Sequence, residues 1–462
     1  RLPMNSPLTS HSLWLGPILA FAAGFLLVTS GFSWDAAITL GVAIICVVWW
    51  IFGPIPIPVT SLIPLIALPM SGVLSMEQTS AAYGHYLVLL LLGGFILSTA
   101  MEKSGAHLRV ALTMVRAFGG TSSRRLVFGF MAASALLSMW ISNTATTLML
   151  LPVALAVIEK ARDPALPVPL LLGIAYAASV VGIGTPIGTP PNVAFMAIYS
   201  EKIGADISFL TWMTWGVPVV LVFLPIVGLW LTRNLRYSGG VDLPEVGDWK
   251  TAERRVMYVF ALTAFAWITR SEPFGGWSAL FSLSDTNDSM VALTAVVIMF
   301  LVPDGEGKKL LDWDSAKKIE WGLLILFGGG IAIAKAFGES GLSESLGQAV
   351  SVLSSWHPLA ILIAICLSVT FMTEMTSNTA TTLLLMPILA AAAIAVGMDP
   401  RLLMVPAAMS ASCAFMLPVA TAPNLVVFST GRFGVDRMVR EGLALNLLGT
   451  VVISSLCFFL LA

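Results

Sequence analysis

The sequence has few charged residues for its length. Only 11% of its 462 residues are Asp, Glu, Lys or Arg, against roughly 25% in an ordinary soluble domain. Residues 126–158, 168–200 and 402–430 contain none of these four types. This composition excludes an ordinary soluble domain, and a charged ligand bound among these stretches would find no side chain of opposite charge.

Cysteines and basic clusters are also scarce. The four cysteines lie far apart inside apolar segments, without the spacing of a metal site or of a disulfide framework. We expect Cys46, Cys366, Cys413 and Cys457 to be buried packing residues. The net charge of −1 and the lack of a long basic block argue against nucleic acid as a partner. No motif indicates an organic cofactor.

Apolar residues, in contrast, are abundant. They make up 57% of the chain, and the mean hydropathy is +0.91. Runs long enough to cross a bilayer, about 20 residues each, begin with residues 13–30, 36–52 and 58–74 and recur as far as residues 443–461. The first run lacks a basic leader and a cleavage pattern, so we interpret it as a membrane span rather than a signal peptide. The sequence predicts a polytopic helical membrane protein.

The distribution of Lys and Arg predicts the orientation in the membrane. If the N-terminus is cytoplasmic, 20 of the 24 Lys and Arg residues fall on the cytoplasmic side, as positive charge does in membrane proteins. The four exceptions are Lys202, Arg270, Lys335 and Arg401. We therefore expect a multi-pass protein of the cell (inner) membrane with a cytoplasmic N-terminus and an extracytoplasmic C-terminus.

The hexapeptide SNTATT occurs twice, at residues 142–147 and 377–382. The apolar region around the first copy, residues 126–158, leaves two arms of about 16 residues, each short of a full span. Its flanks are basic on both sides, with Arg124, Arg125, Lys160 and Arg162. This pattern predicts a re-entrant helical hairpin that enters from the cytoplasm and turns at the motif. The flanks of the second copy are poor in basic residues, so we expect a hairpin that enters from outside.

More of the chain repeats at a similar offset. Residues 92–105 align with residues 328–341 at a shift of 236, close to the shift of 235 between the hexapeptides. A Pro-containing break follows each hairpin, GTPPN at residues 188–192 and ATAPN at residues 420–424. Five predicted spans separate the hairpins, and an odd number of crossings inverts the second half. These spans cover about residues 168–200, 207–232, 255–270, 289–303 and 321–338.

The repeat divides the chain into parts with expected roles. In an alternative interpretation, Gly and Pro only allow close helix packing in a duplicated scaffold. Matched tips and matched breaks instead favour unwound backbone at mid-membrane depth, which persists only when it is buried or lines a wet cavity. We expect first-half scaffold helices at 1–125, a first transport region at 126–206, a connecting helix and cytoplasmic segment at 207–250, second-half scaffold helices at 251–356, a second transport region at 357–431 and a C-terminal helix at 432–462.

The polar tips can bind ions of both signs. Hydroxyl, amide and free carbonyl oxygens suit an alkali cation better than a transition metal. The positive N-terminal end of the returning arm can bind the carboxylate or sulfate oxygens of an anion. Even one buried charge costs about 2.5 to 3.5 kcal/mol on insertion scales. Because no fixed counter-charge is present, the sequence predicts that cations enter together with the anion.

The paired SNT motifs, each followed by a broken helix with a T-x-P-N loop, resemble those of the divalent-anion:sodium symporter family. The resemblance covers essentially the whole chain. It implies an all-α fold with about eleven transmembrane helices plus two re-entrant hairpins, arranged as two inverted repeats. It also implies a homodimer in which a transport domain moves against a fixed scaffold, as an elevator.

The same resemblance implies sodium-coupled uptake of a C4-dicarboxylate such as succinate. A dicarboxylate exchanger of the same fold, or sodium-coupled uptake of citrate or sulfate, remains open. A membrane enzyme would need a nucleophile with a base or a metal cluster at depth, and an ion channel would show a symmetric ring rather than an internal inverted repeat. We therefore expect a transporter and not an enzyme.

The resemblance also implies the site residues. Sodium site one would consist of Ser138, Ser142, Asn143 and the carbonyl of Gly188, and sodium site two of Thr373, Thr376, Asn378 and the carbonyl of Ala420. The substrate would contact Ser142, Asn143, Thr144, Thr189 and Pro190 in the first half and Ser377, Asn378, Thr379 and Thr421 in the second. Two departures stand out: Ala422 replaces the proline of the first loop, and the hydroxyl of Thr376 either adds a ligand or points away.

Several other polar or aromatic residues have two interpretations. Glu374, inside the second hairpin, either binds a proton or a cation near site two or is neutral or hydrogen-bonded within the bundle. For Lys335 we favour a side chain that extends to the membrane interface over a substrate contact. The tryptophans expected in the interfacial belts are Trp49, Trp50, Trp212, Trp215 and Trp321.

Overall fold

The computed structural model of the chain is built from helices. It describes residues 7–118, 122–161, 163–235, 247–272, 275–283, 285–349 and 356–461. In these ranges no strand occurs, and seven helices are long and apolar enough to cross a membrane. The prediction of an all-helical protein with several membrane spans is confirmed. Three basic residues of the charge count, Arg1, Arg162 and Arg236, lie outside the described residues. The same holds for the rest of residues 236–246, which belong to the expected connecting segment.

The first helices of the chain follow its apolar runs. Ser33 begins the second helix by accepting a hydrogen bond from the Ala36 backbone N–H, and Gly53 ends it in a left-handed conformation, as helix ends commonly do. Pro at the first turn begins the two short helices that follow. The helices are α1 (Pro7–Thr29), α2 (Trp34–Phe52), α3 (Ile57–Thr60), α4 (Ile63–Ser71), α5 (Met76–Tyr83), α6 (Tyr86–Ser104) and α7 (Ala106–Phe118).

A helix pair, a broken helix and a long helix complete the first half. The predicted span at 168–200 is interrupted at residues 183–189, because the chain there carries Gly and Pro in place of good helix formers. The elements are α8 (Ser123–Ser138), α9 (Asn143–Lys160), α10 (Pro167–Gly182), α11 (Pro190–Ile203) and α12 (Phe209–Leu231).

The second half repeats this order of elements. Its first part contains α13 (Thr251–Ile268), α14 (Gly276–Leu280), α15 (Asp288–Leu301), α16 (Trp313–Ala316), α17 (Trp321–Glu339) and α18 (Leu342–Ala349). A second helix pair, a second broken helix and a long final helix follow. These are α19 (Pro358–Thr373), α20 (Asn378–Ala395), α21 (Pro400–Ala411), α22 (Ala422–Phe428) and α23 (Val435–Leu461).

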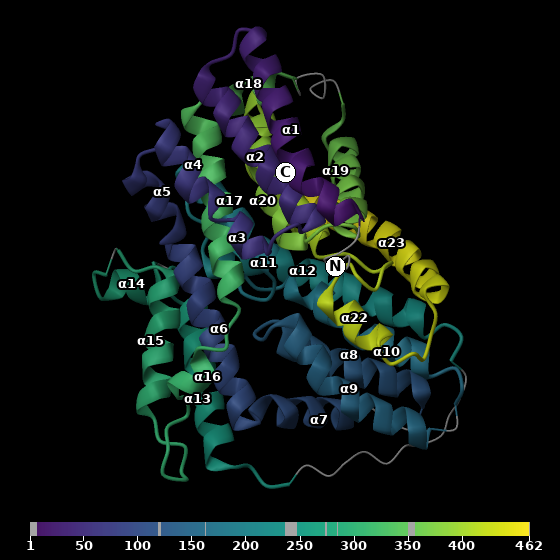
Figure 1. The fold of residues 1–462 in the computed structure, drawn as a ribbon. Coiled ribbons are helices and arrows are strands. Elements are labelled where there is room, and N and C mark those ends of the chain that lie inside the picture. The colour runs from purple at the N-terminus through teal and green to yellow at the C-terminus, as the bar shows by residue number, and fades with distance from the viewer. Residues whose placement is uncertain are drawn as a thin grey trace.

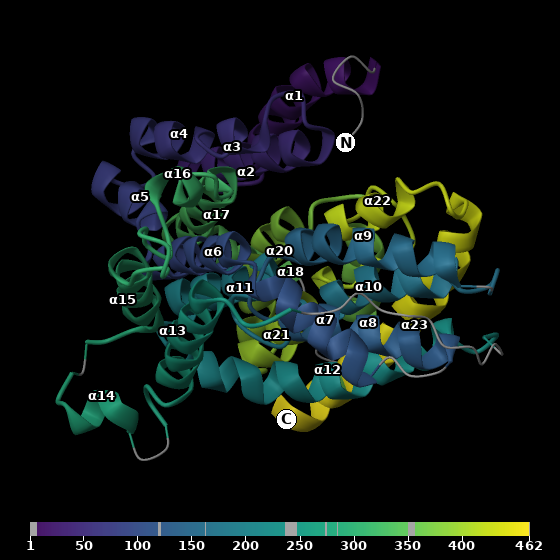
Figure 2. The same ribbon diagram turned by 90° about the horizontal axis from the view of Figure 1, so that it is seen from below.

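The helices form two groups (Figures 1 and 2). The first helix group contains α2 to α6, α13, α15 and α17, and lies on the left in Figure 2. The second helix group contains α8 to α10, α12, α22 and α23, and lies on the other side, while α11 and α20 lie between the two. Each group thus draws helices from both halves of the chain.

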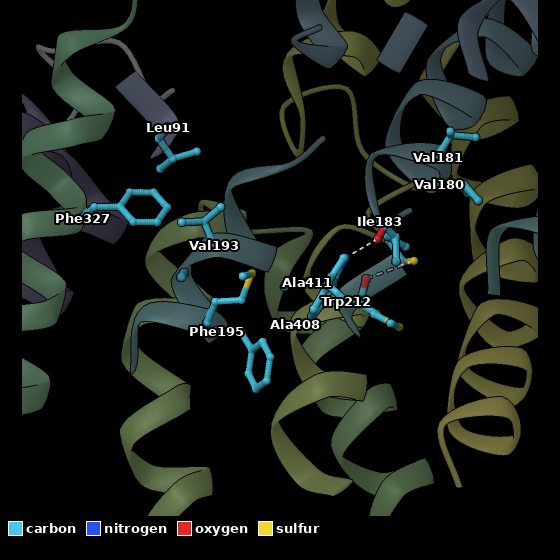
Figure 3. Close-up of a cluster of buried hydrophobic side chains, with 14 of the residues drawn as sticks. Leu91, Val180, Val181, Ile183, Val193, Phe195, Trp212, Phe327, Ala408 and Ala411 are labelled. Atoms are coloured by element: carbon cyan, nitrogen blue, oxygen red, sulfur yellow. Dashed lines mark hydrogen bonds between the residues drawn. The ribbon is translucent and has the colours of Figure 1, made fainter. Parts of the chain in front are cut away.

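Apolar side chains connect the two groups through α11. This helix packs against α6 and α17 of the first group and against α20 and α21, and α21 packs in turn against α23 of the second group. Figure 3 shows Leu91 of α6 and Phe327 of α17 beside Val193 of α11, and all three side chains are buried. The four cysteines are buried and free, which confirms the expectation that they are packing residues.

Candidate functional site

Each SNTATT motif lies at a turn between two helices. Residues 139–142 join α8 to α9, and the Ser142 hydroxyl accepts a hydrogen bond from the Ala145 backbone N–H at 3.3 Å. The Ser377 hydroxyl accepts from Ala380 in the same way at the start of α20. Serine at this position satisfies a backbone N–H that the helix leaves free. The first residue of each motif therefore begins the returning helix.

Asparagine closes each helix break. The Asn192 side-chain amide donates to the carbonyls of Gly182 at 2.9 Å and Thr185 at 2.7 Å. Asn424 donates to Ala414 at 2.9 Å and to Leu417 at 3.0 Å. Unwound backbone at this depth needs such partners, because a buried carbonyl without a hydrogen bond is costly. The Asn of each T-x-P-N loop thus stabilises the break itself.

Aromatic donors bind the same two breaks. The Trp212 indole N–H donates to the Ile183 carbonyl at 2.8 Å, and both residues are labelled in Figure 3. The Tyr176 hydroxyl donates to the Phe415 carbonyl at 2.6 Å. Trp212 is fully buried, so its prediction as an interfacial residue is wrong. The same correction applies to Trp50 and Trp215, which are buried as well.

One cavity of about 1280 Å³ lies where the tips and the breaks meet. It is lined by all nine residues predicted to bind substrate, and by Gly188, Thr376 and Ala420 of the predicted sodium sites. The other two predicted ligands, Ser138 and Thr373, are fully buried. The substrate-site residues that line it are Ser142, Asn143, Thr144, Thr189, Pro190, Ser377, Asn378, Thr379 and Thr421.

The charged residues of the cavity lining come from the ends of two first-group helices. Glu102 and Lys103 lie at the end of α6, and Lys318 and Glu320 lie just before α17. Lys103 pairs with Asp312, with 2.7 Å between Nζ and Oδ2, and this hydrogen bond lowers the pKa of the Asp312 carboxyl. At the tips and breaks, the lining residues are polar or apolar without charge.

Oxygen atoms cluster behind the first tip. The Ser138 hydroxyl donates to the Ala178 carbonyl at 2.9 Å and also contacts the Asn143 side-chain amide. One amide atom of Asn143 lies 3.2 Å from the carbonyl oxygens of both Ala178 and Gly188. With its nitrogen there, Asn143 donates to these carbonyls. With its oxygen there, that atom faces three other oxygens, the Ser138 hydroxyl and the two carbonyls, with one hydroxyl hydrogen among them, an arrangement that a cation stabilises.

Matching oxygens lie behind the second tip. The Thr373 hydroxyl lies 2.6 Å from Asn378 Oδ1 and donates to the Ala411 carbonyl at 2.9 Å. The Thr376 hydroxyl donates to the Met372 carbonyl at 2.8 Å and lies 2.5 Å from the Thr381 hydroxyl. The hydrogen of the Thr376 hydroxyl is therefore engaged in a hydrogen bond within the α19–α20 pair. Each tip thus places a side-chain hydroxyl, an asparagine amide and a backbone carbonyl together, and with the amide oxygen turned toward them these are hard ligands of the kind that alkali cations take.

Close packing at the first break depends on glycine. A Cβ atom on Gly188 would lie 2.5 Å from the Gly182 carbonyl oxygen and 3.0 Å from the Thr185 hydroxyl. Only glycine lets the backbone approach this closely. The Gly188 carbonyl thereby reaches the oxygen cluster at Asn143.

Four helices begin at the cavity. Asn143, Pro190, Asn378 and Ala422 are the first residues of α9, α11, α20 and α22, and all four line it. A helix N-terminus carries roughly half a positive elementary charge. The positive ends of the three longer helices, α9, α11 and α20, therefore face one volume that can accept an anion without Lys or Arg.

Comparison with known proteins agrees with this geometry. Residues 47–404 match the family described as citrate transporter. The chain is 41% identical to the sodium-dependent dicarboxylate transporter SdcS of Staphylococcus saprophyticus, over 97% of this chain and 90% of that protein. It is 38% identical, with the same coverage, to the SdcS proteins of Staphylococcus aureus strains RF122 and MRSA252.

The chain belongs to the family described as citrate transporter. The resemblance to the divalent-anion:sodium symporters that the SNT motifs indicated is thereby confirmed. Two solved transporters share the fold at 14% sequence identity. The YdaH transporter of Alcanivorax borkumensis has a TM-score of 0.57, with 84% of this chain and 86% of that chain covered. MtrF of Neisseria gonorrhoeae has a TM-score of 0.56, with 86% and 83% covered.

Glu374 lies in the turn of the second tip, and its carboxylate accepts four hydrogen bonds. Its Oε1 accepts hydrogen bonds from the backbone N–H groups of Phe415 at 2.7 Å and Met416 at 2.8 Å, and from the Asn446 amide at 2.7 Å. Its Oε2 accepts from the Leu417 N–H at 3.0 Å. Of the two interpretations from the sequence, these four donors favour a hydrogen-bonded carboxylate that fixes the second break.

Lys335 lies away from the cavity lining. Its Nζ is 3.2 Å from Glu201 Oε1, so it forms an ion pair between α17 and α11. This ion pair, outside the cavity lining, argues against the substrate contact considered from the sequence. The sequence also did not reveal the carbonyls of Ala178 and Ala411, because every residue carries a carbonyl and only the fold determines which ones converge.

Proposed function

We propose that this protein carries a C4-dicarboxylate such as succinate across the cell membrane together with sodium ions. The observation that carries the proposal is the cavity in which both SNT tips meet, with an oxygen cluster behind each tip and no charged side chain among the tip and break residues that line it. The names of the curated relatives, sodium-dependent dicarboxylate transporters, support the same substrate and the same ion. The protein is a transporter and not an enzyme.

The two ions would bind first and complete the substrate site. Sodium site one would use Ser138, Ser142, Asn143 and Gly188, with the Ala178 carbonyl as a further ligand. Sodium site two would use Thr373, Thr376, Asn378 and Ala420, with the Ala411 carbonyl. A dianion placed between them would gain from two nearby cations and from the helix N-termini, and so would avoid the cost of an uncompensated buried charge.

The substrate carboxylates would contact the two tips and the two breaks. Asn143 with Thr144 would bind one carboxylate, and Asn378 with Thr379 the other. Ser142, Ser377, Thr189, Pro190 and Thr421 would complete the site. All of these residues line the same cavity, which supports the assignment. No organic cofactor is needed for this binding.

The movement would follow an elevator mechanism. The transport regions, residues 126–206 and 357–431, would move against scaffold helices at 1–125 and 251–356, with 207–250 connecting them and 432–462 as the final helix. The presence of helices from both halves in each of the two groups supports such a division. We further propose about eleven transmembrane helices, two re-entrant hairpins, a homodimer, a cytoplasmic N-terminus and an extracytoplasmic C-terminus. In this orientation the cavity opens to the cytoplasm, beside Lys103 and Lys318.

Uptake of labelled succinate into proteoliposomes tests the proposal. We expect rapid uptake with an inward sodium gradient and little uptake when choline replaces sodium. Equal rates in the two media would refute sodium coupling. Counterflow against internal succinate without any ion gradient distinguishes an exchanger, which would run at full rate in choline. Competition by unlabelled malate, citrate and sulfate then ranks the substrates, since citrate or sulfate is the alternative cargo.

A further inference from the structure

A tryptophan in the turn of the first helix pair contacts both the cavity and a group of aromatic rings outside the pair. Trp140 lies in the turn between α8 and α9, two residues before Ser142, and its side chain helps to line the cavity. On its other side the indole contacts three aromatic rings that belong to neither helix of the pair. Trp140 therefore touches both the proposed substrate volume and a surface outside the hairpin.

The three contacted rings, which we call the aromatic platform, are Phe209, Phe260 and Trp267, and the first and last of these stack on each other with centroids 4.6 Å apart. The ring planes of Trp140 and Trp267 are 7° apart with centroids at 6.4 Å, and those of Trp140 and Phe209 are 11° apart at 6.3 Å. Phe260 meets the Trp140 ring edge-on at 5.9 Å. Offset stacking and edge-on contact are the arrangements that aromatic pairs prefer.

Two of the three platform rings belong to the first helix group, and the third, Phe209, is the first residue of α12 and is tied to α15 of the first group through Asp288. Phe260 and Trp267 lie on α13, and the Trp267 indole N–H donates to the Asp288 carbonyl at 2.9 Å. The Phe209 backbone N–H donates to Asp288 Oδ2 at 2.9 Å, and Arg270 pairs with Oδ1 at 2.6 Å. Asp288 is buried at the start of α15. The surface that receives Trp140 is thus fixed by hydrogen bonds of its own.

The second tip has no matching side chain. The shift of 235 between the motifs places Met375 where the first tip has Trp140. Met375 lines the cavity and is 81% exposed. In the conformation described here the first tip is docked by an aromatic ring, whereas the residue at the same place in the second tip is open to solvent.

We infer that Trp140 is a positioning residue that stabilises the cytoplasm-open state by docking the first tip on the aromatic platform. The inference rests on the proposed function, because it assumes that the tips move relative to α13. Movement to the outward-open state must separate the indole from Phe260 and Trp267. Weakening this contact therefore shifts the population away from the cytoplasm-open state without removing any ligand of the proposed ions or substrate.

Sided labelling of a cysteine at position 375 tests the inference. The M375C variant provides an exposed thiol in the cavity, while the four native cysteines are at most 1% exposed. The rate of reaction with a membrane-impermeant maleimide is measured in right-side-out and inside-out vesicles. In M375C/W140A we expect the ratio of cytoplasmic to outer labelling rates to fall roughly five- to tenfold, the shift that corresponds to losing one aromatic pair.

Matched variants make the result specific. W50F changes another tryptophan of the cavity lining that lies outside the platform, and should leave the ratio unchanged. W140F retains a ring and should give a smaller fall than W140A. F260L weakens the platform from the α13 side and should lower the ratio as well, so a poorly folded W140A does not end the test. An unchanged ratio in folded W140A and F260L would overturn the inference.

The proposed function is checked separately in the same vesicles. Sodium with succinate should slow the labelling of M375C in the parent chain, because both bind beside the thiol. Failure of this protection would count against the proposed function. Protection together with equal labelling ratios in the Trp140 and Phe260 variants would count against the docking role alone.

Discussion

At the residue scale, the proposed mechanism gives the two asparagines of the tips a double role. Each lies beside a buried hydroxyl and a carbonyl on one side and lines the cavity on the other, so one side chain can bind an ion and the substrate at once. Such a residue couples the two ligands directly. Its loss should be more severe than that of a residue that contacts only one of them.

We expect Asn143→Ala and Asn378→Ala to reduce sodium-dependent succinate uptake roughly ten- to a hundredfold, because each removes a hydrogen-bonding group worth about 1.5 to 3 kcal/mol to a charged ligand. Uptake at saturating sodium and the amount of monodisperse protein are the measurements. Asn287→Ala, which removes only the cap of α15, is the control. Parental uptake in either tip variant would mean that the site lies elsewhere.

Gly188→Ala tests the oxygen cluster at Asn143 without changing any side chain that belongs to it. The added methyl group would meet the Gly182 carbonyl and push the Gly188 carbonyl away from Asn143. We expect the half-saturating sodium concentration to rise at least about tenfold, equivalent to about 1.4 kcal/mol. Gly84→Ala, whose Cβ would lie 3.8 Å from its nearest neighbour, is the control. Unaltered sodium dependence in a folded Gly188→Ala protein would remove the Gly188 carbonyl from site one.

The residues most accessible to sequence reasoning were those of the tips and breaks. SNTATT, GTPPN and ATAPN stand out because polar and helix-breaking residues are rare in apolar segments, and the structure brings all of them to one cavity. The roles of Trp140, Trp212 and Tyr176 were not predictable. An aromatic residue in an apolar run has many packing partners, and only the tertiary fold selects one.

At the element scale, the two breaks share an asparagine and an aromatic donor but differ in one carboxylate. The Trp212 indole and Asn192 bind the first break, while Tyr176, Asn424 and the Glu374 carboxylate bind the second. Position 139, which matches Glu374 at the shift of 235, is a methionine. The sequence repeat therefore predicted two breaks but not the carboxylate at one of them, because Glu374 comes from the helix pair and reaches the break only through the tertiary fold.

Glu374→Gln should destabilise the second break. The substitution replaces one carboxylate oxygen by an NH₂ group, which cannot accept a hydrogen bond, and removes the charge from the remaining contacts. We expect the free energy of unfolding to fall by about 2 to 3 kcal/mol, seen as a lower melting temperature in detergent. Glu77→Gln in the exposed first turn of α5 should leave it unchanged. Equal melting temperatures would mean that the four donors bind water as well as they bind the carboxylate.

At the scale of the whole molecule, the repeat was visible in the sequence and the grouping of helices was not. Charge counts and span lengths gave the order of the elements, including the helices around both motifs. Which helices of the two halves pack together depends on side-chain contacts far apart in the chain, such as those of α11 with α6 and α17. Periodicity within one segment does not contain that information.

Sodium and substrate should assist each other's binding across the whole site. In the proposed mechanism the ions bind behind the tips and complete the anion site. We expect the affinity for succinate in detergent solution to rise roughly five- to 150-fold between choline and saturating sodium, and the sodium affinity to rise by the same factor with succinate. Titration calorimetry measures both. Independent binding of the two ligands would contradict coupling through the tips.

The size of the cavity has a consequence for inhibition. Its volume of about 1280 Å³ exceeds the roughly 300 to 1,000 Å³ typical of sites for drug-sized ligands, and a four-carbon acid would fill only a small part of it. A molecule with two carboxylates at the tips and a bulky tail reaching Lys103 and Lys318 would therefore fit, and its tail would prevent the tips from moving. In the proposed orientation it would compete with the substrate from the cytoplasmic face and hold the transporter in one state.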